Sequence, residues 1–118
     1  MDQIQERARE VGRLIAQTEE YRALKRANTQ LGDDRETVTL VNRLEELDGE
    51  ITDRLRRGQE PTQEQQEEYA SLAEKLQQQT AYQAIVAAQS NFDRLMMRVN
   101  EEIARGIEAG EQSRIILP

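Results

Sequence analysis

The sequence predicts an all-α fold: an elongated bundle of about four helices, with long first and last helices and antiparallel helix packing. Apolar residues recur at steps of three and four, which is the period of one helical face, and no competing strand pattern is present. The composition agrees, because 33% of the 118 residues are charged, 3% are aromatic, and there are only six glycines and two prolines. Such a chain favours long solvated helices over a sandwich or an α/β fold.

The first helix is expected over residues 2–30. Gly32 is expected to stop it, and Asp33 or Asp34 to cap the next helix. Gly12 is expected to touch a neighbouring helix, because a glycine within a helix costs about 1 kcal/mol relative to alanine. The apolar stripe of this helix comprises Ile4, Ala8, Val11, Leu14, Ile15, Thr18, Tyr21 and Leu24.

A second helix is expected over residues 35–57, with Gly49 at a bend or a close contact inside it. Gly58 is expected to end it, with Pro61 three residues later. Its stripe comprises Val38, Leu40, Val41, Leu44, Leu47, Ile51 and Leu55.

Thr62 is expected to open a third helix, because Thr62 and Gln65 have capping-box spacing. Its short stripe leads to a bend or break over residues 77–80. A fourth helix is expected over residues 81–109. The stripe of the third helix comprises Tyr69, Leu72, Ala73 and Leu76; that of the fourth comprises Ile85, Ala88, Phe92, Leu95, Met96, Val99, Ile103 and Ile107.

Residues 1–110 are expected to form a single helical domain, and residues 111–118 a flexible tail. Helices of nearly 30 residues would be about 40 Å long, which exceeds what one small globule needs. Long helices of moderate apolar content complete their burial against another chain, so a homodimer or higher oligomer is expected.

Composition excludes several classes of chemistry. The chain has no Cys and no His, so it cannot supply disulfides, thiolate nucleophiles, Cys/His zinc sites or histidine acid–base catalysis. Its acidic clusters lack the frame of an EF-hand or a di-iron bundle. A net charge of −7 argues against direct nucleic-acid binding. No apolar stretch approaches the roughly 20 residues of a membrane span, and we expect a cytoplasmic protein.

The residues singled out are therefore those of helix packing or an interface, and no catalytic, cofactor-binding or metal-binding residue is predicted. Tyr21 has two interpretations: an anchor for a partner, or a half-buried ring packed within the monomer, which is favoured. A dimer core and a monomer core look alike in sequence at the other positions. The predicted packing or interface residues are Val11, Gly12, Ile15, Tyr21, Phe92, Leu95, Met96, Val99 and Ile103.

Several short motifs follow one another in a set order and spacing. They are Ala8, Val11-Gly12, Ile15 and 18–21; Asp34-Arg35-Glu36 and Leu40; the turn over 58–62; and 92–96, Val99-Asn100 and Ile103. In the order and spacing of these motifs, over roughly residues 5–107, the chain resembles the YlbF/YmcA family of small helical bacterial proteins.

The resemblance implies a helical protein that forms dimers or higher assemblies. It also implies a regulator without catalysis of its own, influencing competence, sporulation, biofilm formation and RNA processing through protein partners. Some complexes in the family carry Fe–S clusters and flavin, but this chain has no cysteine to supply cluster ligands. We expect no cofactor and no small-molecule substrate. Three alternatives stay open: a structural or chaperone-like bundle without a regulatory role, a family member of unassigned function, and a bundle that binds a small molecule or metal.

Overall fold

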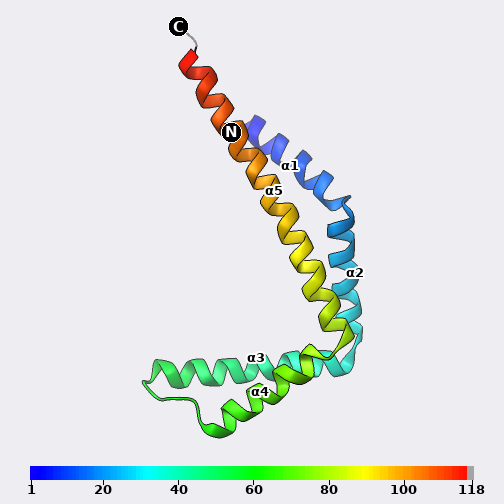
Figure 1. Ribbon diagram of the computed structural model, residues 1–118, viewed down its shortest axis with the longest axis vertical. Helices are drawn as coiled ribbons and strands as arrows, with labels where there is room; N and C mark the ends of the chain where they lie inside the picture. Colours follow the sequence, from blue (N-terminus) through cyan, green and yellow to red (C-terminus); the bar gives the residue numbers. More distant parts are fainter. Residues whose placement is uncertain (117–118) are drawn as a thin grey trace. The chain divides into compact units, whose positions relative to one another are not determined.

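The computed structural model describes residues 1–116, and over these residues the chain is all-α, as predicted. The described residues form five helices, one more than predicted (Figure 1). They are α1 (Asp2–Ala16), α2 (Glu19–Asp33), α3 (Arg35–Arg56), α4 (Gln63–Gln77) and α5 (Thr80–Ile116).

The predicted helix over residues 2–30 is wrong, because the chain breaks between α1 and α2. The N–H groups of Gln17 and Thr18 donate three residues back, to the carbonyls of Leu14 (3.1 Å) and Ile15 (3.0 Å). The Thr18 hydroxyl also donates to the Ile15 carbonyl (2.7 Å) and accepts from the N–H of Tyr21 (3.2 Å). A threonine oxygen that accepts from the third residue of a helix is an N-cap. The sequence places Thr18 on the apolar stripe, but its hydroxyl caps the start of a new helix.

The two predicted helix starts downstream are confirmed. The Asp34 carboxylate accepts from the N–H of Thr37 (3.2 Å) and caps α3. At α4, the Thr62 hydroxyl accepts from the N–H of Gln65, and the Gln65 side chain accepts from the N–H of Thr62, both at 3.0 Å. This reciprocal pair is the capping box that the sequence spacing indicated.

Gly58 ends α3 as predicted, with φ +75°. Its N–H donates to the Leu55 carbonyl (3.0 Å), and the N–H of Gln59 donates to the Arg54 carbonyl (2.9 Å), which together form a Schellman motif. Gly32 was expected to play the same part, but α2 continues through it to Asp33. The helix stops there because Asp34 adopts an extended backbone and caps α3.

Substitution by alanine is expected to have opposite effects on stability at Gly49, inside α3, and at Gly58, just after its end. A Cβ at Gly49 would meet no atom within 4 Å, so the close contact expected there is not found within the chain. Gly49→Ala is expected to raise the free energy of unfolding by up to about 1 kcal/mol. Gly58→Ala is expected to lower it by about 1–2 kcal/mol, because alanine is strained at positive φ. Urea denaturation of both variants checks this, and a shared sign would contradict it.

The last helix is longer than predicted. It begins at Thr80, after the expected break, and runs to Ile116 rather than ending near Ala109. Much of the segment 111–118 is therefore helical, while residues 117 and 118 lie outside the described residues. The flexibility expected of this segment stays a prediction.

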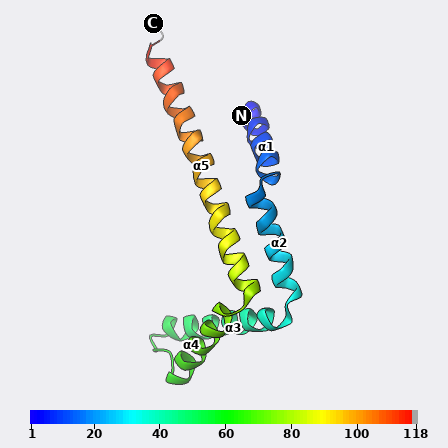
Figure 2. The same ribbon diagram turned by 45° about the vertical axis from the view of Figure 1, so that its right-hand side comes forward.

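The chain divides into two compact units, one of residues 25–87 and the other of residues 1–24 with the chain from Ala88 onward. In the first unit α3 and α4 lie side by side (Figures 1 and 2). Its interior is small, with Leu47 and Thr37 fully buried and Ala27 and Leu76 nearly so. The Thr37 hydroxyl donates to the side-chain oxygen of Gln79 (3.4 Å), so this buried polar group is satisfied.

An arginine fork joins α3 to α4. Arg43 donates from Nε and Nη2 to the two carboxylate oxygens of Glu68, both at 2.7 Å, and its Nη1 lies 3.2 Å from Glu46 and 3.6 Å from Glu50. The bidentate bond from Arg43 lowers the pKa of the Glu68 carboxyl below its ordinary 4.5.

This fork predicts a pH dependence. Because the pKa of Glu68 is lower in the folded state, its stabilising contribution is present above the unfolded pKa, near 4.5, and is lost as pH falls through the folded pKa. The stability difference between wild type and Glu68→Gln should therefore shrink as pH falls below about 4.5. Urea denaturation across pH measures it, with Glu74→Gln on the same helix as the control. A difference that is constant with pH would contradict the assignment.

Candidate interaction groove on α1 and α5

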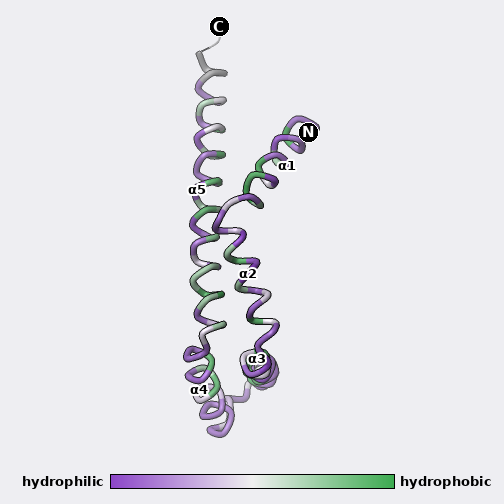
Figure 3. The backbone as a smooth tube through the Cα atoms, turned by 90° about the vertical axis from the view of Figure 1, so that its right-hand side faces the viewer, coloured by the Kyte–Doolittle hydropathy of each residue, from purple (hydrophilic) through white to green (hydrophobic). Residues whose placement is uncertain are grey.

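The other unit is thinly packed. None of the 15 residues of α1 is buried. Ala88 of α5 is buried, and Tyr21 packs against Phe92 with ring centroids 6.0 Å apart and planes tilted by 56°. Figure 3 shows hydrophobic residues recurring along α1 and α5 between hydrophilic ones, the pattern of amphipathic helices.

A groove of about 600 Å³ lies along these two helices. One side is made by α1 residues at steps of three and four, and the other by α5 residues at the same steps, because each helix presents one apolar face. The lining residues are Gln3, Ile4, Arg7, Ala8, Val11, Gly12 and Ile15 of α1, and Met96, Val99, Asn100 and Ile103 of α5.

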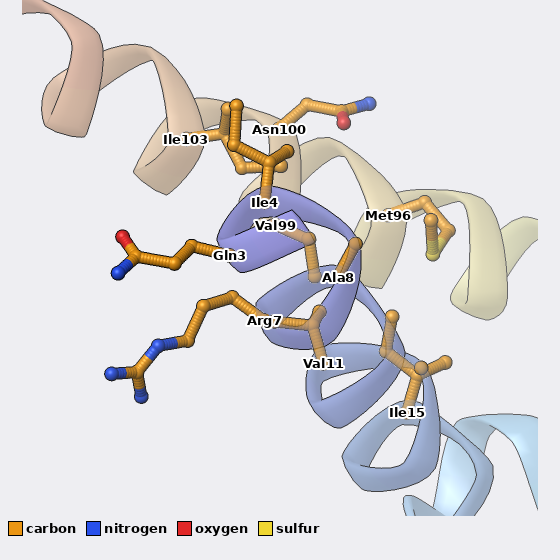
Figure 4. Close-up of a pocket in the computed structure, with 11 residues that line it drawn as sticks. Gln3, Ile4, Arg7, Ala8, Val11, Ile15, Met96, Val99, Asn100 and Ile103 are labelled. Carbon is orange, nitrogen blue, oxygen red and sulfur yellow. The ribbon is translucent and has the colours of Figure 1, made fainter. Parts of the chain in front are cut away.

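The polar residues of the groove stand at its rim. In Figure 4 the side chains of Gln3 and Arg7 extend away from α5, whereas Ala8 and Ile15 lie on the side of α1 near Met96. Arg7 is also within ion-pair distance of Glu10, 3.7 Å away on the same helix, and both side chains are largely exposed. The other lining residues are apolar, apart from Asn100 of α5.

Large apolar side chains in the groove face solvent. Ile4 is 65% exposed and Ile103 is 55% exposed, although Ala8, Val11 and Val99 stand beside them. Single exposed apolar residues are ordinary on a protein surface, but a contiguous set flanked by polar residues is typical of an interaction site. The chemistry that this groove offers is apolar binding.

The structure divides the nine predicted interface residues into three groups. Tyr21 and Phe92 contact each other within the chain. Leu95 lines a separate, smaller depression with Ala23 and Arg94. The six that line the groove are Val11, Gly12, Ile15, Met96, Val99 and Ile103.

Gly12 faces the open groove rather than another helix of its own chain. A Cβ placed on it would meet no heavy atom within 4 Å. Its contact with a helix of a neighbouring chain stays a prediction. Ile4 and Ala8 also line the groove. The sequence places both on the apolar stripe of the first helix, but they are not among the nine predicted interface residues.

The described residues 1–116 hold neither a metal-binding cluster nor a membrane-spanning helix. Within that range no three His, Cys, Asp or Glu side chains are grouped so that they could hold a metal ion. Over the same residues, no helix combines the length and the apolar composition of a membrane span.

Comparison with known proteins gives both relatives and a family. The chain is 29% identical over 115 residues to a UPF0342 protein of Lactobacillus delbrueckii subsp. bulgaricus, covering 97% of this chain and 98% of that protein. It is 21% identical over 104 residues to a UPF0342 protein of Leuconostoc mesenteroides, covering 88% and 89%. Residues 4–108, which include both sides of the groove, match the family described as "Control of competence regulator ComK, YlbF/YmcA". The chain therefore belongs to the YlbF/YmcA family, whose description names the control of a competence regulator.

Proposed function

We propose that this protein is a non-catalytic regulatory adaptor that acts by protein–protein association, with the groove on α1 and α5 as its association surface. The observation that carries the proposal is the contiguous aliphatic lining of the groove, in which Ile4 and Ile103 are more than half exposed. Family membership supports a regulatory role, because the family description names the control of a regulator.

The groove suits a helix of a protein partner better than a small polar ligand. Amphipathic helices bind apolar grooves through side chains at steps of three and four, which is the spacing on both sides of this one. A polar substrate would need several convergent polar groups, whereas two of the three polar lining residues, Gln3 and Arg7, extend away from α5. The partners proposed are a second copy of the chain and a protein of a regulatory or RNA-processing complex.

Co-purification at native expression level tests this function. The adaptor proposal expects one or two proteins in stoichiometric amounts. Many substoichiometric unfolded proteins would instead favour the chaperone-like alternative, because exposed aliphatic side chains such as Ile4 and Ile103 would also hold unfolded clients. Either that result, or the absence of a stoichiometric partner, would overturn the adaptor proposal.

The purified protein is also expected neither to bind RNA tightly nor to cleave it. A chain of net charge −7 lacks the cationic surface that neutralises phosphates, and it has no histidine for acid–base catalysis. Filter binding at about 0.15 M salt and incubation of labelled RNA with Mg²⁺ or Mn²⁺ check this. Sub-micromolar binding, or cleavage that follows the protein through purification, would identify an RNA-active protein instead.

A further inference from the structure

We propose that α1 is an exchangeable arm, and that in the dimer α1 of each copy lies along Met96, Val99 and Ile103 of the other copy. The inference rests on the proposed function, because it takes the groove as the association surface and names the occupant. Three observations support it: how loosely α1 is held, how the chain bends at Thr18, and how much surface one copy leaves uncovered.

Little holds α1 to its own chain. It has no buried residue, and Ile4 and Leu14 are each 65% exposed. Its glycine, Gly12, faces open space where a neighbouring helix could approach closely. The ion pair of Arg7 and Glu10 lies within α1 and would move with it. Detaching α1 therefore uncovers little surface that is not already exposed.

The bend between α1 and α2 can straighten. The segment 15–19 has no glycine or proline, and Gln17 stays in the right-handed helical region with φ −92° and ψ −5°. A continuous helix requires the N–H groups of Gln17 and Thr18 to move from carbonyls three residues back to carbonyls four residues back. The apolar stripe keeps its helical period across the bend, so a straight helix also has one apolar face.

The uncovered surface is large enough for a second copy. The solvent-accessible area of the chain is 9504 Å², whereas a folded monomeric protein of 13.6 kDa exposes about 6,600 Å². The excess of about 2,900 Å² compares with the roughly 1,000–2,500 Å² that each subunit buries in an obligate homodimer. Exchange of identical arms restores the contacts that each copy gives up and adds those between the copies.

The absence of cysteine allows a direct test by crosslinking. Ala8→Cys on α1 and Val99→Cys on α5 are combined in one chain and treated with a short bis-maleimide under native conditions. Arm exchange is expected to give covalent dimers on a denaturing gel. Crosslinks confined to single chains, or no crosslinks, would overturn it. Light scattering on the same sample separates the two proposals: a dimer with intrachain crosslinks overturns only arm exchange, and a monomer removes the self-association on which both rest.

A second variant tests the bend itself. Glu19 is the first residue of α2, where proline is well tolerated, but in a continuous helix it is an interior residue whose N–H is needed. Glu19→Pro in the crosslinking background is expected to lower the yield of covalent dimer at least about tenfold. Glu19→Ala, which removes the same carboxylate without fixing the backbone, should retain the yield. Equal yields from the two variants would contradict straightening at this bend.

Discussion

Replacing Leu47 with alanine is expected to lower the free energy of unfolding by about 2–5 kcal/mol. Leu47 is fully buried, and it is one of very few apolar side chains in the described structure of which this is true. A small interior has few neighbours that can close over the cavity, so the variant should lose a large part of the stability typical of a domain of this size. Urea denaturation followed by far-UV circular dichroism measures the loss.

Leu55→Ala is the matched control. Leu55 lies on the same helix, α3, but is 57% exposed, and the same truncation there is expected to change stability by less than about 0.5 kcal/mol. Equal destabilisation of the two variants would contradict the claim that burial of Leu47 stabilises residues 25–87.

Ile103→Asp is expected to weaken self-association by about 100-fold or more. Ile103 is 55% exposed and lines the groove, so an aspartate there leaves the single chain nearly undisturbed. In a dimer the same carboxylate would be buried in an aliphatic interface without a partner, which costs about 3 kcal/mol or more, and each 1.4 kcal/mol is roughly a tenfold change in Kd. Sedimentation velocity over a dilution series measures the change.

Met97→Asp controls for the charge. Met97 is 61% exposed on the same helix, α5, but does not line the groove. It should associate like the wild type, and both variants should keep the wild-type circular dichroism spectrum. Equal weakening by the two substitutions would show that the groove is not the specific association surface.

Local sequence signals predicted three of the helix ends. The Asp34 cap, the pairing of Thr62 with Gln65, and Gly58 each act through the backbone of their own neighbourhood, so the residue type and its spacing were sufficient. Thr18 was different, because it falls on the apolar face. Its hydroxyl can either bond to a carbonyl within one continuous helix or cap the start of a new helix. Periodicity has no means to choose between those two outcomes.

The sequence could indicate the apolar faces that line the candidate groove, but not the groove itself. The period placed Val11 and Ile15 on one helix and Val99 and Ile103 on another, and all four line the groove. The same period could not tell that Phe92 would meet Tyr21 while Ile103 stayed exposed. That difference depends on where the two helices lie close together, which is a tertiary property.

The central claim is that the protein associates through the exposed groove on α1 and α5. The mass of the unmodified protein in solution tests this claim most directly, because a second copy is the one partner that is always present. Light scattering at tens of micromolar is expected to give at least twice the 13.6 kDa mass of the chain. A mass of 13.6 kDa at that concentration would contradict the account.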